Sequence, residues 1–375
     1  MVAYLDNSAT TPLCKKAKGR MTDAIENIWG NPSSLHEKGI EADLLLKNAR
    51  KALAGHLSCS EKEIVFTSGG TEGNNLAVFG AAHANKRKGN RVITSTVEHP
   101  SVQKAFDRLE AEGFEVIRIP TDKKGFIKLD ELENAVNEKT VLISIMAVNN
   151  EVGTIQPVEK LSAIVKRKGS PALIHVDAVQ AFGKLPLSPK KLGIDLMTVS
   201  SHKIHGPKGA GALFIKEGTR ISPVAAGGGQ ERDIRPGTEP MPAIAGFWGA
   251  MEELRIKDSL AEVTELRDYL VSEISKRDFI TVNSPENALP YIINLSLPGL
   301  RSETVLNFLS DMEIYVSSGS ACSKGHKSPV LTAMGLDDSL IDSSIRISMS
   351  RFTTKEQLDS LLNALDTAIK VIRKK

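Results

Sequence analysis

The sequence has few of the features that mark secreted or membrane proteins. Only three of its 375 residues are cysteine, Cys14, Cys59 and Cys322, and this small odd number argues against a disulfide scaffold or a four-ligand zinc site. No uncharged apolar stretch reaches about 18 residues, so we expect no membrane span. The N-terminus, MVAYLDNSATTP, lacks a basic leader followed by an apolar stretch, so we expect no signal peptide. These absences favour a cytoplasmic protein.

A strong excess of one charge is also missing. Lysine and arginine number 48 against 45 aspartate and glutamate residues, a net charge of +3. A dedicated nucleic-acid binder clusters its basic residues on one face. Here the two signs alternate along helical stretches such as EKGIEADLLLKNARK (37–51), which indicates solvated helix faces. We therefore expect no direct nucleic-acid partner.

From residue 63, short β-branched runs alternate with amphipathic helical patterns. The runs are EIVFTSG (63–69), RVITST (91–96), TVLISIMAV (140–148), PALIHVD (171–177), LMTVSSH (196–202) and GALFI (211–215). This alternation predicts βαβ units and a largely parallel α/β sheet. The runs are continuously apolar, as expected of strands that helices cover on both faces.

The remaining segments predict helices around this sheet and a second, smaller part. Residues 39–57 form one apolar helical stripe: Ile40, Leu44, Leu45, Ala49, Ala52, Leu53 and Leu57. A glycine-rich stretch without an element of its own (225–240) precedes a long helical segment from about 242 to 277. The C-terminal third mixes strands (291–297, 344–350) with helices, the last at 355–372, and reads as α+β. We expect a large domain over 15–255 and a small domain built from 1–14 and 256–375.

Ligands of α/β sheets bind at the carboxyl ends of the strands, where several polar residues fall. In FTSGGTEGN (66–74), Gly69, Gly70 and Thr71 stand at a predicted helix start, where free N–H groups can cradle a phosphate. The stretch matches neither a Walker loop nor the dinucleotide motif. Taken alone, the stretch is better explained as a plain strand–helix turn with a Thr or Ser cap.

Other strand ends carry a histidine, amides and an aspartate. His99 follows one strand, and a helix cap or a satisfied core histidine is the alternative interpretation. Asn149 and Asn150 follow another, where turn-forming asparagines would suffice. Asp177 ends a buried run with Gln180 three residues later; the alternative is a helix N-cap.

Lys203, in SSHKIHGPKG (200–209), ends a further strand, where a buried charge is costly unless it is solvated, paired or used chemically. Pyridoxal phosphate (PLP) requires this combination: a lysine that bonds its aldehyde, an acid facing its pyridine nitrogen, a group stacked on the ring and phosphate donors. The set of strand-end residues therefore predicts a PLP enzyme.

The chain resembles the class-V branch of fold-type I PLP enzymes, and within it the cysteine desulfurases of nitrogen fixation and iron–sulfur assembly. The matching stretches run in order along nearly the whole chain: YLDNSATTP, GNPSSLH, IVFTSGGTEGNN, EHPSV, VNNEVGTIQP, HVDAVQAFGKLP, SSHKIHGPKGAGAL, RPGTEP, SSGSACS and SSIRISMSRFTT. The resemblance implies a mostly parallel seven-stranded sheet covered by helices, with a smaller α+β C-terminal domain.

The resemblance also implies roles around the PLP ring. Lys203 would bond the cofactor covalently, and Asp177 would pair with the pyridine nitrogen. Gln180 and Asn150 would contact the phenolic oxygen. His99 would stack on the ring and move protons.

Further residues would hold the phosphate and the substrate. Phosphate ligands would be Gly70, Thr71, Ser200 and His202, with Thr238 reaching across the interface of a homodimer. Arg346 would grip the substrate carboxylate, a task suited to its fixed fork, with help from Asn31 and Asn150. No metal is expected.

Cys322 decides the reaction that we predict. It lies in SSGSACSKGHKSP, a small and polar stretch without apolar periodicity, and Lys324, His326 and Lys327 would favour its thiolate. Desulfuration of L-cysteine would give L-alanine and a persulfide on Cys322, which a sulfur-acceptor protein (an iron–sulfur scaffold or a tRNA-thiolation enzyme) would collect. The basic stretch after Cys322 and the end of the chain at Lys375 leave that acceptor open. A selenocysteine lyase or class-V aminotransferase is the nearest alternative, and a non-catalytic scaffold protein the more distant one.

Overall fold

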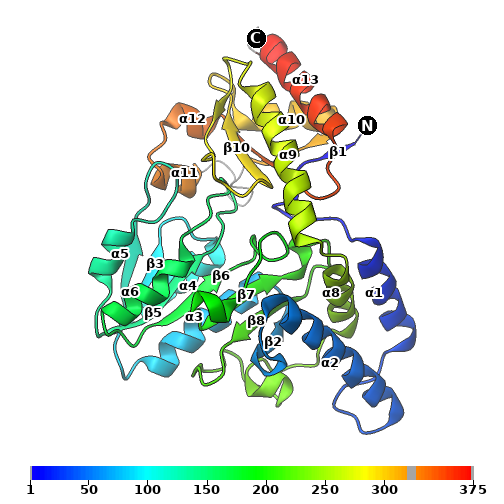
Figure 1. Ribbon diagram of the computed structural model, residues 1–375, viewed down its shortest axis with the longest axis vertical. Helices are drawn as coiled ribbons and strands as arrows, with labels where there is room; N and C mark the ends of the chain where they lie inside the picture. The colour runs from blue at the N-terminus through cyan, green and yellow to red at the C-terminus, as the bar shows by residue number, and fades with distance from the viewer. Residues whose placement is uncertain (1, 319–326, 373–375) are drawn as a thin grey trace.

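A seven-stranded sheet forms the centre of the larger part of the molecule (Figure 1). The computed structural model describes residues 2–318 and 327–372. In sheet order the strands are β2 (Ile64–Thr67), β8 (Gly211–Ile215), β7 (Leu196–Ser200), β6 (Leu173–Asp177), β5 (Thr140–Met146), β3 (Arg91–Ser95) and β4 (Glu115–Ile119). All pairs are parallel except those of β8, which runs antiparallel to β2 and β7. The predicted α/β fold with a mostly parallel seven-stranded sheet is confirmed.

The strands bury both of their faces, as their continuous apolar runs predict. Val92 and Leu142 belong to a core under helices α3 (Gly70–Asn85) and α4 (Pro100–Ala111). Their neighbours Ile93 and Ile143 point to the opposite face and join the main core. Successive side chains of a strand point to opposite faces, so each strand contributes to both cores.

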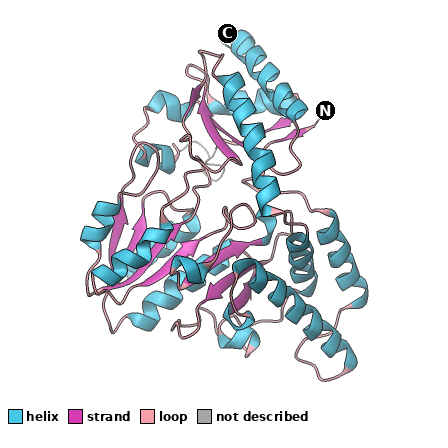
Figure 2. Ribbon diagram, in the orientation of Figure 1, coloured by secondary structure: helices cyan, strands magenta, loops and turns pink. Residues whose placement is uncertain are grey.

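Helices surround this sheet (Figure 2). Those of the larger part besides α3 and α4 are α1 (Lys15–Asn27), α2 (Glu37–Leu57), α5 (Leu129–Ala135), α6 (Leu161–Arg167), α7 (Pro189–Leu192) and α8 (Met241–Glu252). Helix α9 (Ile256–Ile274) leads from this part to the C-terminal elements (Figure 1).

The C-terminal elements form two small sheets with helices against them. Strands β12 (Ser344–Ser348), β10 (Ile292–Ser296) and β9 (Thr281–Val282) make an antiparallel sheet, and β1 (Ala3–Tyr4) pairs in parallel with β11 (Ile314–Tyr315). The helices are α10 (Ser302–Asp311), α11 (Pro329–Ala333), α12 (Asp338–Asp342) and α13 (Lys355–Ile372). The N-terminal strand thus lies among C-terminal elements, while the domain boundaries expected from the sequence stay a prediction.

The structure corrects three expectations. The segment predicted as one helix over 242–277 is two, α8 and α9, which separate where the Glu253 carboxylate accepts hydrogen bonds from Lys16 N and Arg351. Ile40 and Leu44 are exposed, because the buried stripe of α2 runs instead through Ala42, Leu45, Leu46, Ala49 and Leu53. The glycine-rich stretch contains a short 3-10 turn, Gln230–Asp233. None of the helices in the described ranges is both long and apolar enough to span a bilayer.

Candidate active site

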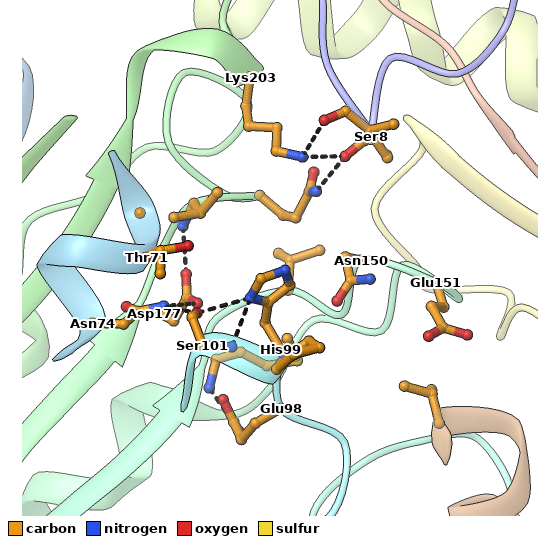
Figure 3. A pocket seen from close by; sticks show the side chains of 18 of the residues that line it. Ser8, Thr71, Asn74, Glu98, His99, Ser101, Asn150, Glu151, Asp177 and Lys203 are labelled. Atoms are coloured by element: carbon orange, nitrogen blue, oxygen red, sulfur yellow. Dashed lines mark hydrogen bonds between the residues drawn. The ribbon is translucent and has the colours of Figure 1, made fainter. Parts of the chain in front are cut away.

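A cavity of 690 Å³ opens at the carboxyl ends of the parallel strands (Figure 3). Asp177 is the last residue of β6, and Lys203 closes the short turn that follows β7. His99 follows β3 and Asn150 follows β5. All four line the cavity, because parallel strands end at one edge of the sheet.

The Asp177 carboxylate is buried and held by two donors. Asn74 Nδ2 donates to its Oδ2 at 2.7 Å, and the backbone N–H of Val179 donates to its Oδ1 at 3.0 Å. The bond from the Val179 N–H is a local contact of the kind expected from the alternative interpretation, in which Asp177 caps the following turn. Each oxygen keeps a further lone pair, so the carboxylate can also accept an N–H from a ligand in the cavity.

His99 combines the cap and the pocket interpretations. It is the N-cap of α4, with Nδ1 accepting from the backbone N–H of Ser101 at 3.2 Å. Nδ1 also lies 2.8 Å from Ser101 Oγ, which accepts from Asn74 Nδ2 at 2.8 Å. Burial lowers the pKa of His99, against the opposing effect of Asp177. The ring is therefore neutral and its orientation is fixed.

Lys203 projects into the cavity from the opposite side (Figure 3). Its Nζ donates to the carbonyl oxygens of Ser8 and, at 2.8 Å, of Ala9. Burial lowers the pKa of this lysine to about 8, and the positive charge of Arg346 adds to the effect. An amine with such a pKa is partly neutral near pH 7, and the neutral form is nucleophilic.

Gln180 and Asn150 also line the cavity. Gln180 Nε2 donates to the carbonyl oxygen of Ser8 at 2.9 Å. The backbone oxygen of Asn150 accepts from Arg346 Nη1 at 2.9 Å.

Arg346, in β12, brings a buried guanidinium to the same cavity. Its Nη2 pairs with Asp6 Oδ1 at 2.8 Å, while its Nε is buried without a hydrogen-bond partner among the described residues. A buried N–H without a partner is costly, and a carboxylate oxygen would satisfy it.

Four of the five predicted phosphate ligands lie near the start of α3: Gly70, Thr71, Ser200 and His202. Gly70 and Thr71 begin this helix and line the cavity with His202. A Cβ atom on Gly70 would lie 2.7 Å from Val179 Cγ2 and 3.9 Å from Ser200 Cβ, so glycine lets the helix start approach the ends of β6 and β7. Ser200 Oγ is buried and has no partner within the described structure. Burial lowers the pKa of His202 to about 4, so its imidazole is neutral.

This donor set fits PLP. Free N–H groups at the helix start and the unpartnered Ser200 hydroxyl suit a phosphate. The Asp177 carboxylate could accept the N–H of a pyridine ring in the cavity. His99 lies beside the space between Asp177 and Lys203, and Lys203 faces that space from the other side. No three His, Cys, Asp or Glu side chains gather into a metal site in the portion that the structure describes.

Three predicted site residues of the described structure do not line this cavity: Asn31, Thr238 and the fully buried Ser200. Asn31 and Thr238 are exposed and do not line the cavity of their own chain. Cys322 lies outside the described residues, as do Lys324 and His326. Lys327 lines the cavity, with its ammonium 2.6 Å from Asp338.

The sequence reasoning missed several residues of the site. Asn74 and Ser101 link His99 to Asp177, and Ser8 supplies a carbonyl oxygen to Lys203 and Gln180. Asn74 had a usable signal, since it lies one helical turn after Gly70 and shares its face.

The two described cysteines are not in the cavity. Cys14 is buried, and burial raises the pKa of its thiol. Burial and then Glu63 raise the pKa of half-buried Cys59 to about 12. Both therefore stay protonated, as expected of small core residues.

Comparisons with known proteins agree with this site. The family model "Aminotransferase class-V" matches residues 3–361. The cysteine desulfurase IscS of Dictyoglomus turgidum is 42% identical over 376 residues, covering 99% of this chain and 95% of its own. A solved structure titled "NIFS-LIKE PROTEIN" has 40% identity and a TM-score of 0.93, covering 99% of this chain and 100% of its own. Another solved structure, titled "SspA in complex with cysteine", has 32% identity and a TM-score of 0.83, covering 94% of this chain and 100% of its own.

Fold, pocket and comparisons together define an enzyme of the class-V aminotransferase family that uses PLP. Within this family the chain belongs to the cysteine desulfurases, the group that its relatives represent over nearly their full length.

Proposed function

We propose that this pocket desulfurates L-cysteine and that Cys322 receives the sulfur as a persulfide. The observation that carries the proposal is the meeting of Lys203, Asp177 and His99 in one cavity whose wall includes Arg346 and Lys327. Lys327 lies five residues after Cys322. The solved relative titled "SspA in complex with cysteine" gives further support.

Lys203, Asp177, His99 and the phosphate ligands of α3 would hold PLP. When bound, PLP draws electrons away from the α- and β-carbons of an amino acid. Asp177 would keep the pyridine nitrogen protonated, since Asn74 and Val179 fix its carboxylate there. His99 would exclude water from one face of the ring.

Lys203 would take the proton from the substrate α-carbon. Its pKa of about 8 suits a base that works near neutral pH. The neutral imidazole of His99 would carry a proton on the cofactor side, since its Nδ1 is engaged with Ser101 and its Nε2 stays available.

Arg346 would bind the substrate carboxylate. Its unpartnered Nε and the adjacent Nη groups present donors along one edge of the guanidinium. A bidentate pair would fix the amino acid with its sulfur away from Asp6.

The Cys322 thiolate would then attack the substrate sulfur. An S–S bond forms as the substrate C–S bond breaks, and the electron pair of that bond stays with the substrate carbon. Protonation of this carbon completes L-alanine. The charge of Lys327 is shared with Asp338, so it would favour the thiolate less than a free lysine.

The test is the intact mass of the holoenzyme after brief mixing with L-cysteine without reductant. The proposal predicts the added mass of a sulfur atom on the peptide that contains Cys322, with L-alanine in the filtrate. The matched variants are Cys322→Ser, expected to bind PLP but gain no sulfur, and Cys14→Ser, expected to behave like the wild type. A PLP-loaded wild type that gains no sulfur and releases no alanine would move the function to an aminotransferase or selenocysteine lyase.

A second copy of the chain would complete the site. Thr238 and Asn31 are exposed here, and exposed large apolar side chains precede and follow Asn31 in the sequence: Ile25, Trp29, Leu35, Ile40 and Leu44. An exposed group of large apolar side chains is typical of an interface. The Glu231 carboxylate, held by Arg50 at 2.6 and 2.9 Å, fixes the segment that leads to Thr238. Sedimentation should therefore find a homodimer, and a fully active monomer would refute the role of Thr238.

The persulfide would pass to an acceptor protein of iron–sulfur assembly or tRNA thiolation, in the cytoplasm. The unpaired cysteines Cys14 and Cys59 support a reducing compartment.

A further inference from the structure

Lys184 is a buried lysine next to the pocket that the mechanism above does not use. It lies four residues after Gln180, and its Nζ donates to Gln180 Oε1 at 3.0 Å. No carboxylate pairs with it in the described ranges, and its nearest ring is Tyr291, 5.6 Å from Nζ. A buried ammonium without a counter-charge is costly, and burial, together with the charges of Lys203 and Arg346, lowers the pKa of Lys184 to about 7. The persistence of its charged form therefore needs a reason.

Solvent does not supply that reason. The small cavity that touches Lys184 and Lys203 has a volume of 30 Å³, the room of roughly one water molecule. The charged and titratable groups around Lys184 in the described structure include Lys203, Arg346, Arg351, His202, His205 and Tyr291. All of these are cationic or neutral, so they do not offset its charge.

The contacts of Lys184 fix the orientation of the Gln180 amide. An ammonium only donates hydrogen bonds, so the amide oxygen must face Lys184. The carbonyl of Ser8 only accepts, so the amide nitrogen must face Ser8 and the cavity. Both neighbours therefore present Gln180 to the cavity as a donor.

We propose that Lys184 is a positioning residue that, through Gln180, supplies positive charge to an anionic oxygen of the bound cofactor. The proposal deepens the function proposed above and rests on the contact between Gln180 and the phenolic oxygen of PLP. The chain Lys184–Gln180–oxygen aligns a cation, an amide dipole and an anion, so each hydrogen bond strengthens the next. The anion brought by PLP is then the counter-charge that Lys184 lacks.

The test measures the pH titration of the visible absorption of the PLP-loaded protein. Lys184→Met keeps the length of the side chain but removes the donor and the charge. Without them the anionic form of the cofactor oxygen is less stable. The titration midpoint should therefore rise by about 1 pH unit, as expected for one lost charge-assisted hydrogen bond. Lys191→Met, which changes an exposed lysine of α7, is the matched control and should leave the midpoint unchanged.

A double-mutant cycle separates positioning from simple charge. In a Gln180→Ala background, Lys184→Met should no longer move the midpoint. An equal shift in both backgrounds, or no shift in either, would overturn the proposal. Lys184→Gln keeps a donor without the charge and should give an intermediate midpoint, and it replaces Lys184→Met if that variant does not fold.

A separate readout distinguishes failure of the proposed function. Borohydride reduction followed by peptide mass mapping reports whether PLP is bonded to Lys203, and it does not depend on Lys184. PLP bonded to another residue would refute the proposed site itself. PLP bonded to Lys203, with an unchanged midpoint of the absorption titration in Lys184→Met, would refute only the role of Lys184.

Discussion

The pKa of Lys203 predicts how the cofactor-free protein takes up PLP as the pH changes. Burial lowers the pKa of this amine to about 8, although the amine donates to two carbonyl oxygens, and the positive charge of Arg346 contributes further. Only the neutral amine can attack an aldehyde. The rate of covalent PLP uptake should therefore follow the neutral fraction of Lys203.

The size of the effect follows from the two pKa values. At pH 7 a lysine with a pKa of about 8 is roughly 10% neutral, whereas one with the ordinary value near 10.5 is about 0.03% neutral. The pocket therefore raises the concentration of the reactive form roughly 300-fold at that pH. Above pH 8 the advantage fades, because Lys203 is then mostly neutral already.

Stopped-flow mixing of the apoprotein with PLP tests this reasoning. The second-order rate constant should rise about tenfold per pH unit below pH 8 and level off above it. The reaction of Nα-acetyl-lysine, which keeps a free side-chain amine, corrects for the titration of PLP itself. Its rate constant, measured under the same conditions, should keep rising towards pH 10. Arg346→Met should raise the pH at which the uptake rate of the protein levels off, because it removes a cation and leaves the negative charge of Asp6 unpaired. A protein rate that climbs in parallel with acetyl-lysine would refute the assigned pKa.

Three further predictions concern the residues around the site. Asn74→Leu removes a buried donor from the Asp177 carboxylate, worth about 1.5–3 kcal/mol, so PLP should bind roughly 10- to 150-fold more weakly in equilibrium dialysis; unchanged affinity would contradict this role. Arg346→Lys should lower kcat/KM for L-cysteine by about 30-fold, or ~2 kcal/mol, through the lost bidentate fork, while the PLP absorbance stays the same. His175 is buried with a pKa lowered to about 3 by desolvation, so below pH 6.5 the unfolded chain binds a proton that the native protein refuses. The free energy of unfolding, measured with urea, should then fall by up to about 1.4 kcal/mol per pH unit between pH 6 and 4. His175→Gln should flatten that slope, and equal slopes in the two proteins would exclude His175 as a cause of the fall.

The sheet could be predicted because its strands are buried on both faces and therefore consist of unbroken apolar runs. Strand β4 gives no such run, since it lies at the edge and Arg118 within it pairs with Asp107 and Glu110 at 2.9 Å. The break between α8 and α9 was also hidden from the sequence. It depends on tertiary contacts of Glu253 with Lys16 and Arg351, and no proline or glycine marks it.

The site could be predicted as far as its chemistry depends on side-chain type at a strand end. Lys203, Asp177 and His99 meet those conditions, so the strand order alone brings them together. Ser8 does not, because it contributes a backbone oxygen that every residue carries. Asn31 and Thr238 do not line this cavity, so their roles stay a prediction.

Lys184 and Lys203 mark the point at which sequence reasoning ends. Lys203 follows a strand directly, and its neighbours Ser200 and His202 give it a chemical context. Lys184 follows a turn after Gly183, a setting in which most lysines are solvated, and its burial depends on the packing of Tyr291 from the C-terminal part. Only the assembled fold places its ammonium against Gln180. Lys203 lowers the pKa of Lys184 across the same small cavity. Because such a coupling is reciprocal, Lys184→Met should raise the Lys203 pKa and move the pH at which PLP uptake levels off to a higher value. A levelling-off that stays near pH 8 would mean that Lys184 does not contribute to the pKa of Lys203, which burial and Arg346 then set.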